Sequence, residues 1–96
     1  MDKELVKSLI SFIEEHQHLV DDEAQSEIRQ YIHFDEWEKA YEILLFELIQ
    51  NKRYPKPFFP ETWLKFITDF GINKDPVVDG HLMTNFDKWV RGHQGD

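Results

Sequence analysis

Apolar residues recur three or four positions apart in five stretches of the chain, and this spacing constrains the fold more than any other feature. An α-helix places residues with that spacing on one face. No stretch alternates apolar and polar residues in the way that a half-buried strand does. The sequence therefore predicts an all-α fold, a single small bundle of about five helices formed by residues 1–96. The expected helices cover about residues 2–16, 21–33, 35–49, 60–70 and 79–90, and residues 91–96 are expected to be a frayed tail.

The third of these helices is expected to be the central one. Asp35 and Glu38 have the spacing of a capping signal at a helix N-terminus, as Asp22 and Gln25 do for the second helix. A helix that is apolar around most of its circumference is usually enclosed by its neighbours. The apolar residues of the third helix surround most of the helical wheel: Trp37, Ala40, Tyr41, Ile43, Leu44, Leu45, Phe46, Leu48 and Ile49.

The connection after the third helix contains three prolines within six residues, so residues 52–60 are not expected to be helical. Pro60 can open the fourth helix, and Gly71 is expected to end it in a left-handed conformation. The tryptophans of three different helices are expected in the core. Three aromatic residues of the connection either fold over the bundle as a lid, which we favour, or project towards a partner: Tyr54, Phe58 and Phe59.

The charge of the chain is strongly asymmetric. Net charge is −8, and residues 14–47 carry 11 acidic side chains against two basic ones, whereas residues 48–96 carry six acidic and seven basic ones. A nucleic-acid-binding surface has the opposite sign, so direct binding of nucleic acid is not expected. A basic protein is the natural counterpart of the acidic half.

The residue types argue against catalysis and against a cofactor. The chain has no cysteine, no phosphate-binding glycine loop and no serine in a tight glycine-flanked turn. His16 and His18 lie two residues apart, whereas helical metal ligands are usually four apart. We therefore expect no enzyme and no metal site. The alternative hypothesis is a metal-dependent hydrolase that uses these two histidines and neighbouring carboxylates.

Nothing in the sequence predicts a membrane or export segment. The N-terminus is acidic where a signal peptide is basic, and the longest apolar run, residues 43–46, is far too short to span a bilayer. The expected location is the cytoplasm, and the expected free state is a monomer.

Residues 28–72 resemble the MafI family of α-helical bacterial immunity proteins. The resemblance is carried by residues 32–44, Ile-His-Phe-Asp-Glu-Trp-Glu-Lys-Ala-Tyr-Glu-Ile-Leu, and continues through Leu48 to Gly71. Tyr41 departs from the family pattern, where leucine is expected, and residues 73–90 match nothing in it. The resemblance implies a cytosolic protein that binds one cognate toxin domain, commonly a nuclease, and blocks it.

The charge pattern and the resemblance together predict the partner-binding residues. Acidic side chains would steer a basic toxin domain, and an aromatic ring would anchor it. A helical adaptor or regulator, or a nucleic-acid mimic that binds a basic protein, is the alternative that uses the same charge. The predicted contacts lie on the outer face of the second helix and at the start of the third: Asp21, Asp22, Glu23, Glu27, Tyr31, Asp35, Glu36 and Glu38.

Overall fold

The chain folds into helices joined by short turns, with one longer irregular connection before the last helix. The computed structural model describes residues 2–93 of the 96-residue chain. Within that part no β-strand occurs, so the all-α prediction is confirmed. In chain order the elements are α1 (Lys3–His16), the short 3₁₀-helix η1 (Gln17–Leu19), α2 (Asp22–His33), α3 (Trp37–Gln50), α4 (Pro60–Asp69) and α5 (Leu82–Arg91).

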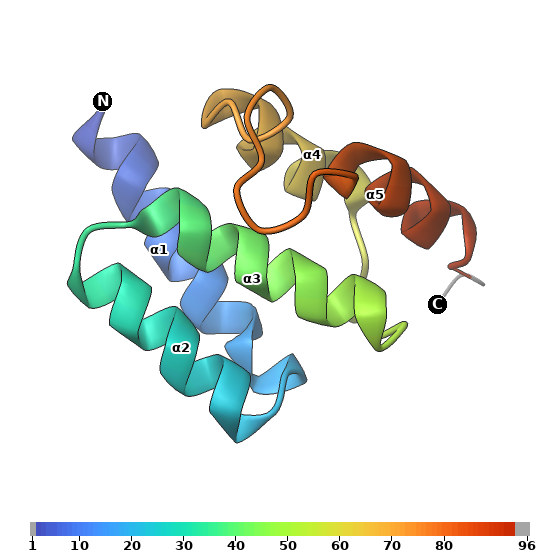
Figure 1. Cartoon of the computed structure of the whole chain (residues 1–96), viewed down its shortest axis with the longest axis horizontal. Coiled ribbons are helices and arrows are strands. Elements are labelled where there is room, and N and C mark those ends of the chain that lie inside the picture. The colour runs from blue at the N-terminus through green and yellow to red at the C-terminus, as the bar shows by residue number, and fades with distance from the viewer. Residues whose placement is uncertain (1, 94–96) are drawn as a thin grey trace.

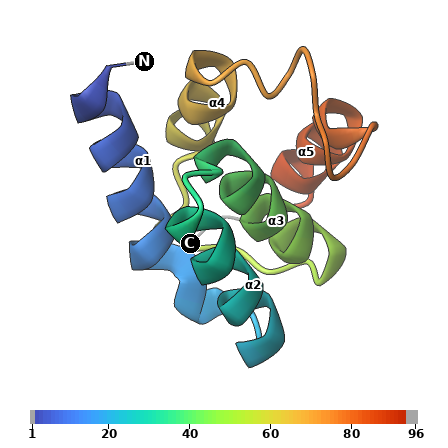
Figure 2. The same ribbon diagram turned by 60° about the vertical axis from the view of Figure 1, so that its left-hand side comes forward.

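Helix α3 lies in the middle of the bundle, with the other four α-helices around it (Figures 1 and 2). Residues 40–45 are six consecutive buried positions, which is possible only when a helix has neighbours on every side. Ile43, about 100° around the helix from Leu44, is buried as well. The prediction that this helix is central is confirmed.

The turn between α2 and α3 differs from the expectation. Asp35 has a left-handed backbone, with φ of +59°. Its N–H donates to the carbonyl of Ile32 (3.1 Å), and the N–H of Glu36 donates to the carbonyl of Tyr31 (2.8 Å). These two bonds close α2 as a Schellman motif. The expected cap at Asp35 is therefore wrong: α3 begins at Trp37, and no side chain caps it.

The same motif ends α3 at Lys52 (φ of +52°) and α4 at Gly71 (φ of +69°). After Gly71, the N–H of Ile72 donates to the carbonyl of Ile67 (2.9 Å), and the Ile72 side chain is buried. The C-cap predicted at Gly71 is confirmed. Of these three left-handed positions only Gly71 has no Cβ, so the other two helix ends are strained.

Helix α2 begins where expected, but without the capping box expected between Asp22 and Gln25. Asp21, not Asp22, is the N-cap, and its Oδ1 accepts a hydrogen bond from the N–H of Ala24 (2.9 Å). The side chain of Gln25 does not return to Asp22 but donates to the carbonyl of Val20 (2.8 Å). Asp21 is therefore partly engaged in holding the helix.

The proline-rich connection forms a partial lid. The Tyr54 ring stacks on Trp89, with centroids 5.1 Å apart, and its hydroxyl donates to the Trp89 carbonyl (2.6 Å). Phe58 is buried and lies 4.8 Å from the same indole. Phe59, in contrast, remains 54% exposed. The lid interpretation holds for the first two aromatic residues, and the third points outward.

The tryptophan prediction is correct for two of the three. Trp63 and Trp89 are buried, whereas Trp37, in the first turn of α3, is only half-buried. Residues 91–93 of the expected tail lie within the described part. Arg91 is still helical, and the ring of His93 packs 4.9 Å from Tyr54, while residues 94–96 lie outside the described part.

The last helix starts three residues later than expected. Asp79 lies before α5 and organises its start: one carboxylate oxygen accepts from the His81 N–H (2.9 Å), the other from the Asn85 side chain (2.9 Å). These bonds, the one from Asn85 first, lower the pKa of Asp79. Leu82, the first residue of the helix, is fully buried.

Candidate protein-binding surface

Three of the predicted contact residues come together between α2 and α3. Asp21, Glu23 and Glu27 line one shallow depression, and the opposite wall is supplied by Glu47 of α3. We call these four carboxylates the acidic groove. None of them takes part in the ion pairs found within residues 2–93, which are Lys39–Glu36, Lys65–Asp69 and Arg91–Asp87. The negative charge of the groove is therefore not neutralised within the described structure.

Glu47 shows the electrostatic consequence of this arrangement. Partial burial raises the pKa of its carboxyl, and three neighbouring charges raise it further: those of Asp21, Glu27 and Glu23. The Asn51 side chain partly opposes this shift. The sequence prediction did not include Glu47, because nothing in the sequence shows that α2 and α3 pack with their carboxylates facing each other.

Asp22 and Tyr31 lie on either side of that cluster. Asp22 is exposed in the first turn of α2 but does not line the groove. Tyr31 is half-buried, and the ammonium of Lys39 lies 5.2 Å from the centre of its ring. Lys39 is also paired with Glu36 at 3.6 Å. The expected aromatic anchor is thus partly covered by a residue of its own chain.

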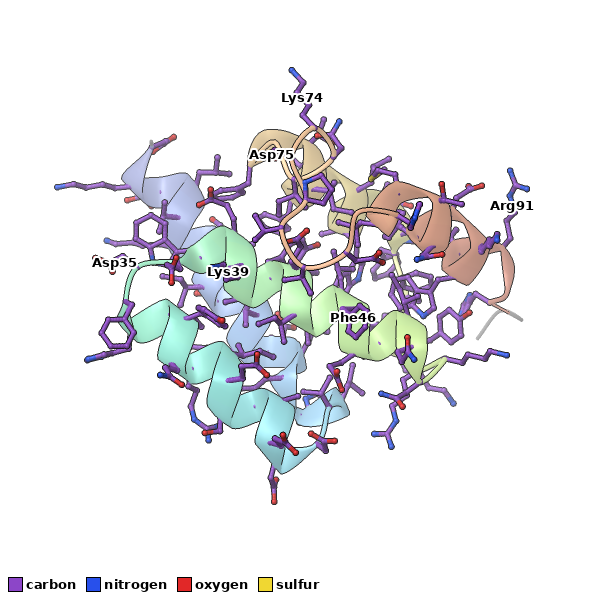
Figure 3. The ribbon with its side chains drawn as sticks, in the orientation of Figure 1. Asp35, Lys39, Phe46, Lys74, Asp75 and Arg91 are labelled. Atoms are coloured by element: carbon purple, nitrogen blue, oxygen red, sulfur yellow. The ribbon has the colours of Figure 1, made fainter. Side chains whose placement is uncertain are left out.

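The other three predicted contacts form a separate group at the turn between α2 and α3. Asp35, Glu36 and Glu38 line a second depression together with Lys39 and Val77. Figure 3 shows Asp35 on the turn before α3 and Lys39 in the first turn of α3, below the loop that carries Lys74 and Asp75. The predicted set of eight therefore does not line one site. Three residues line the acidic groove, three line the second depression, and Asp22 and Tyr31 line neither.

Glu42 is a further candidate residue, and the sequence analysis did not predict its position in the structure. It is the one charged residue in the described core, with 2% of its surface exposed. Its carboxylate accepts hydrogen bonds from the N–H of Val77 (2.9 and 3.0 Å) and of Val78 (3.0 Å). These hydrogen bonds hold the connection between α4 and α5 against the front of α3 (Figure 1). A glutamate within an apolar helix was the available signal, but its partners lie 35 residues away.

His16 and His18, the two histidines of the alternative hydrolase hypothesis, lie in different environments. The Nδ1 of His16 lies 2.8 Å from the carbonyl of Phe12, and its ring packs 4.9 Å from that of Trp63. His16 is half-buried, whereas His18 is exposed. Within residues 2–93 no three histidine, aspartate or glutamate side chains are placed so that they could hold a metal ion together.

Another surface depression, of about 600 Å³, lies between the end of α3 and α5. The Tyr54–Trp89 stack forms part of its wall. Two lysines, Lys52 and Lys88, and no acidic side chain line it, whereas four carboxylates line the acidic groove.

No helix in the described part of the chain has the length and apolar character needed to cross a bilayer. Comparison with protein-family models, with curated proteins and with solved structures found no match to this chain. The resemblance of residues 28–72 to the immunity proteins therefore rests on the sequence pattern alone.

Proposed function

We propose that this chain is an immunity protein. It binds a cognate secreted or contact-delivered toxin domain, a nuclease, and neutralises it by covering its basic surface. The observation that carries the proposal is the acidic groove. Glu23, Glu27 and Glu47 face one another without a basic partner in the described structure. Partial burial, together with the neighbouring acidic charges, raises the pKa of the Glu47 carboxyl, so its charged form is disfavoured in the free protein.

A basic partner would remove that cost. A nuclease must present positive charge to hold phosphates, and a lysine or arginine placed in the groove would replace repulsion with attraction. Charges that are complementary across an interface mainly raise the association rate. The same arrangement supports the alternative, a regulator that mimics nucleic acid, and the identity of the partner distinguishes the two.

The proposal is tested first with the neighbouring gene. The reading frame immediately upstream should encode a large exported protein with a basic C-terminal domain. That domain, carrying an inactivating substitution, should bind this chain, and the active domain should lose its nuclease activity at a 1:1 ratio. A basic domain that neither binds nor is inhibited would contradict the proposal.

The role of the groove is tested by the double variant Glu23→Lys/Glu27→Lys, in which two exposed residues reverse their charge. We expect unchanged helicity and melting, association with the toxin domain slowed by about tenfold, and weaker protection of cells. The matched control is Glu14→Lys/Glu15→Lys on α1, which changes net charge equally at two exposed positions. Slowing in both variants to the same extent would mean that overall charge, not the groove, steers the partner.

A further inference from the structure

Three of the large apolar side chains that remain exposed belong to the turn between α2 and α3 and to the connection before α5. Phe34 is 63% exposed, Val77 is 66% and Val78 is 37%. Val77 lines the same depression as Asp35 and Glu38, and Phe34 directly precedes Asp35. We call Phe34, Asp35, Glu36, Glu38, Val77 and Val78 the α2–α3 corner.

The backbone holds the two valines outside the core. Their N–H groups donate to the buried carboxylate of Glu42, which would lose all of these hydrogen bonds if the connection moved away. Burying a carboxylate without partners is strongly unfavourable. The connection is therefore fixed on α3 through its main chain, and the valine side chains stay exposed.

Phe34 is held outside in a comparable way. Its own N–H donates to the carbonyl of Gln30 (3.2 Å), and the left-handed Asp35 reverses the chain immediately after it. The Phe34 ring lies 5.1 Å from that of His33, itself an exposed residue. The fixed turn therefore leaves the Phe34 ring on the surface, next in the chain to the carboxylates of Asp35 and Glu36.

We propose that the α2–α3 corner is the apolar centre of the interface with the toxin domain. This inference rests on the proposed function and adds the part of the surface that holds the partner. The occupant is an apolar side chain of the toxin domain flanked by lysine or arginine. The apolar group contacts Phe34 and Val77, and the flanking cations meet the carboxylates of Asp35, Glu36 and Glu38.

Charge supports that choice of occupant. Three carboxylates line the depression beside Val77, and the one cation that lines it with them, Lys39, is already paired with Glu36 and placed over the Tyr31 ring. An acidic or purely apolar partner would leave these carboxylates without counter-charges. The acidic groove then raises the association rate, and the α2–α3 corner lowers the dissociation rate.

The test is the double variant Phe34→Ser/Val77→Ser, measured by binding kinetics with the C-terminal domain of the upstream exported protein. Both residues are mostly exposed, so melting should change little. We expect dissociation to be at least about tenfold faster, as for an interface hot spot, and association to change less than about twofold. The matched control is Phe59→Ser/Leu64→Ser, the other exposed apolar pair (54% and 42%), which should dissociate like the parent.

A second measurement locates the contact directly. A photo-crosslinking residue at position 77 should capture the toxin domain, and the same residue at position 64 should not. Two results would contradict the proposal that the α2–α3 corner is the interface centre: a Phe34→Ser/Val77→Ser variant that dissociates like the parent, or crosslinking from position 64 alone. Neither result would contradict the proposed function. If the domain does not bind the parent chain at all, the proposed function and this inference are both wrong.

Discussion

The acidic groove and the aromatic packing around Trp63 are built in opposite ways. Around Trp63 the rings of Phe12, Tyr41 and Trp89 lie with centroids 4.6 to 6.0 Å away, and the Tyr41 hydroxyl donates to the Trp63 carbonyl (2.9 Å). We call these four residues the aromatic cluster. Its buried polar group is satisfied and its rings are in contact, which is what stability requires.

The groove lacks such compensation. Four carboxylates share one depression, and the described ion pairs all lie elsewhere. The comparison teaches that the aromatic cluster, where side chains of α1, α3, α4 and α5 meet, is built for stability, while the exposed edge shared by α2 and α3 carries unfavourable charge. Departures from local optimisation of this kind are expected where a surface serves binding.

The largest effect should come from the aromatic cluster. Trp63→Ala should lower the free energy of unfolding by about 3–5 kcal/mol, because a fully enclosed indole leaves a cavity that its neighbours cannot refill. The matched control is Trp37→Ala, whose side chain is only half-buried, and it should cost less than about 2 kcal/mol. Urea denaturation measures both, and equal costs would contradict the distinction between the two tryptophans.

The next effect concerns the connection that carries Val77 and Val78. Glu42→Ala should cost about 1.5–3 kcal/mol, since two partly buried amides lose a charged acceptor. Hydrogen exchange at both amides should become faster. Glu38→Ala, one turn earlier and exposed, should change stability by less than about 0.5 kcal/mol. Unchanged protection of these amides in Glu42→Ala would show that the carboxylate does not hold the connection.

The strained helix ends should give a smaller effect of opposite sign. Asp35→Gly and Lys52→Gly should each stabilise the chain by about 0.5–1 kcal/mol, because glycine adopts a positive φ without the Cβ penalty. Gly71→Ala should destabilise it by about 1 kcal/mol or more, although a Cβ there meets no atom within 4 Å. Thermal melts of the three variants check this. A loss of stability in Asp35→Gly would mean that its carboxylate supports the turn.

The smallest expected effect tests the groove itself. The folded-state pKa of Glu47 is raised, so folding favours its protonated form, and stability falls as pH rises through that folded pKa. Glu47→Gln should therefore melt above the parent at pH 7, by a surface-charge effect of about 0.5 kcal/mol. The difference should shrink below the carboxyl range and in high salt. A Glu47→Gln variant that melts below the parent at pH 7 would show that the groove is not strained.

Much of the fold could be predicted because it depends on short-range patterns. The spacing of apolar residues located the five helices, and the apolar circumference of residues 40–48 identified the central one. Gly71 ended α4 as expected, since glycine has little competition at a left-handed position. The cap at Asp35 was mispredicted because the same residue types that begin a helix also tolerate the left-handed turn that ends one.

Other features were decided by tertiary packing. Local spacing fixes which residues share a helix face, but not which face meets which neighbour. Glu47 joined Asp21, Glu23 and Glu27 only because α2 packs antiparallel against α3. Glu42 became buried because amides 35 residues away satisfied it. The sequence by itself determined the helices, the core helix and the excess of negative charge in residues 14–47. The tertiary structure decided how that charge divides into a groove and a corner, because contacts between distant segments depend on how whole helices pack.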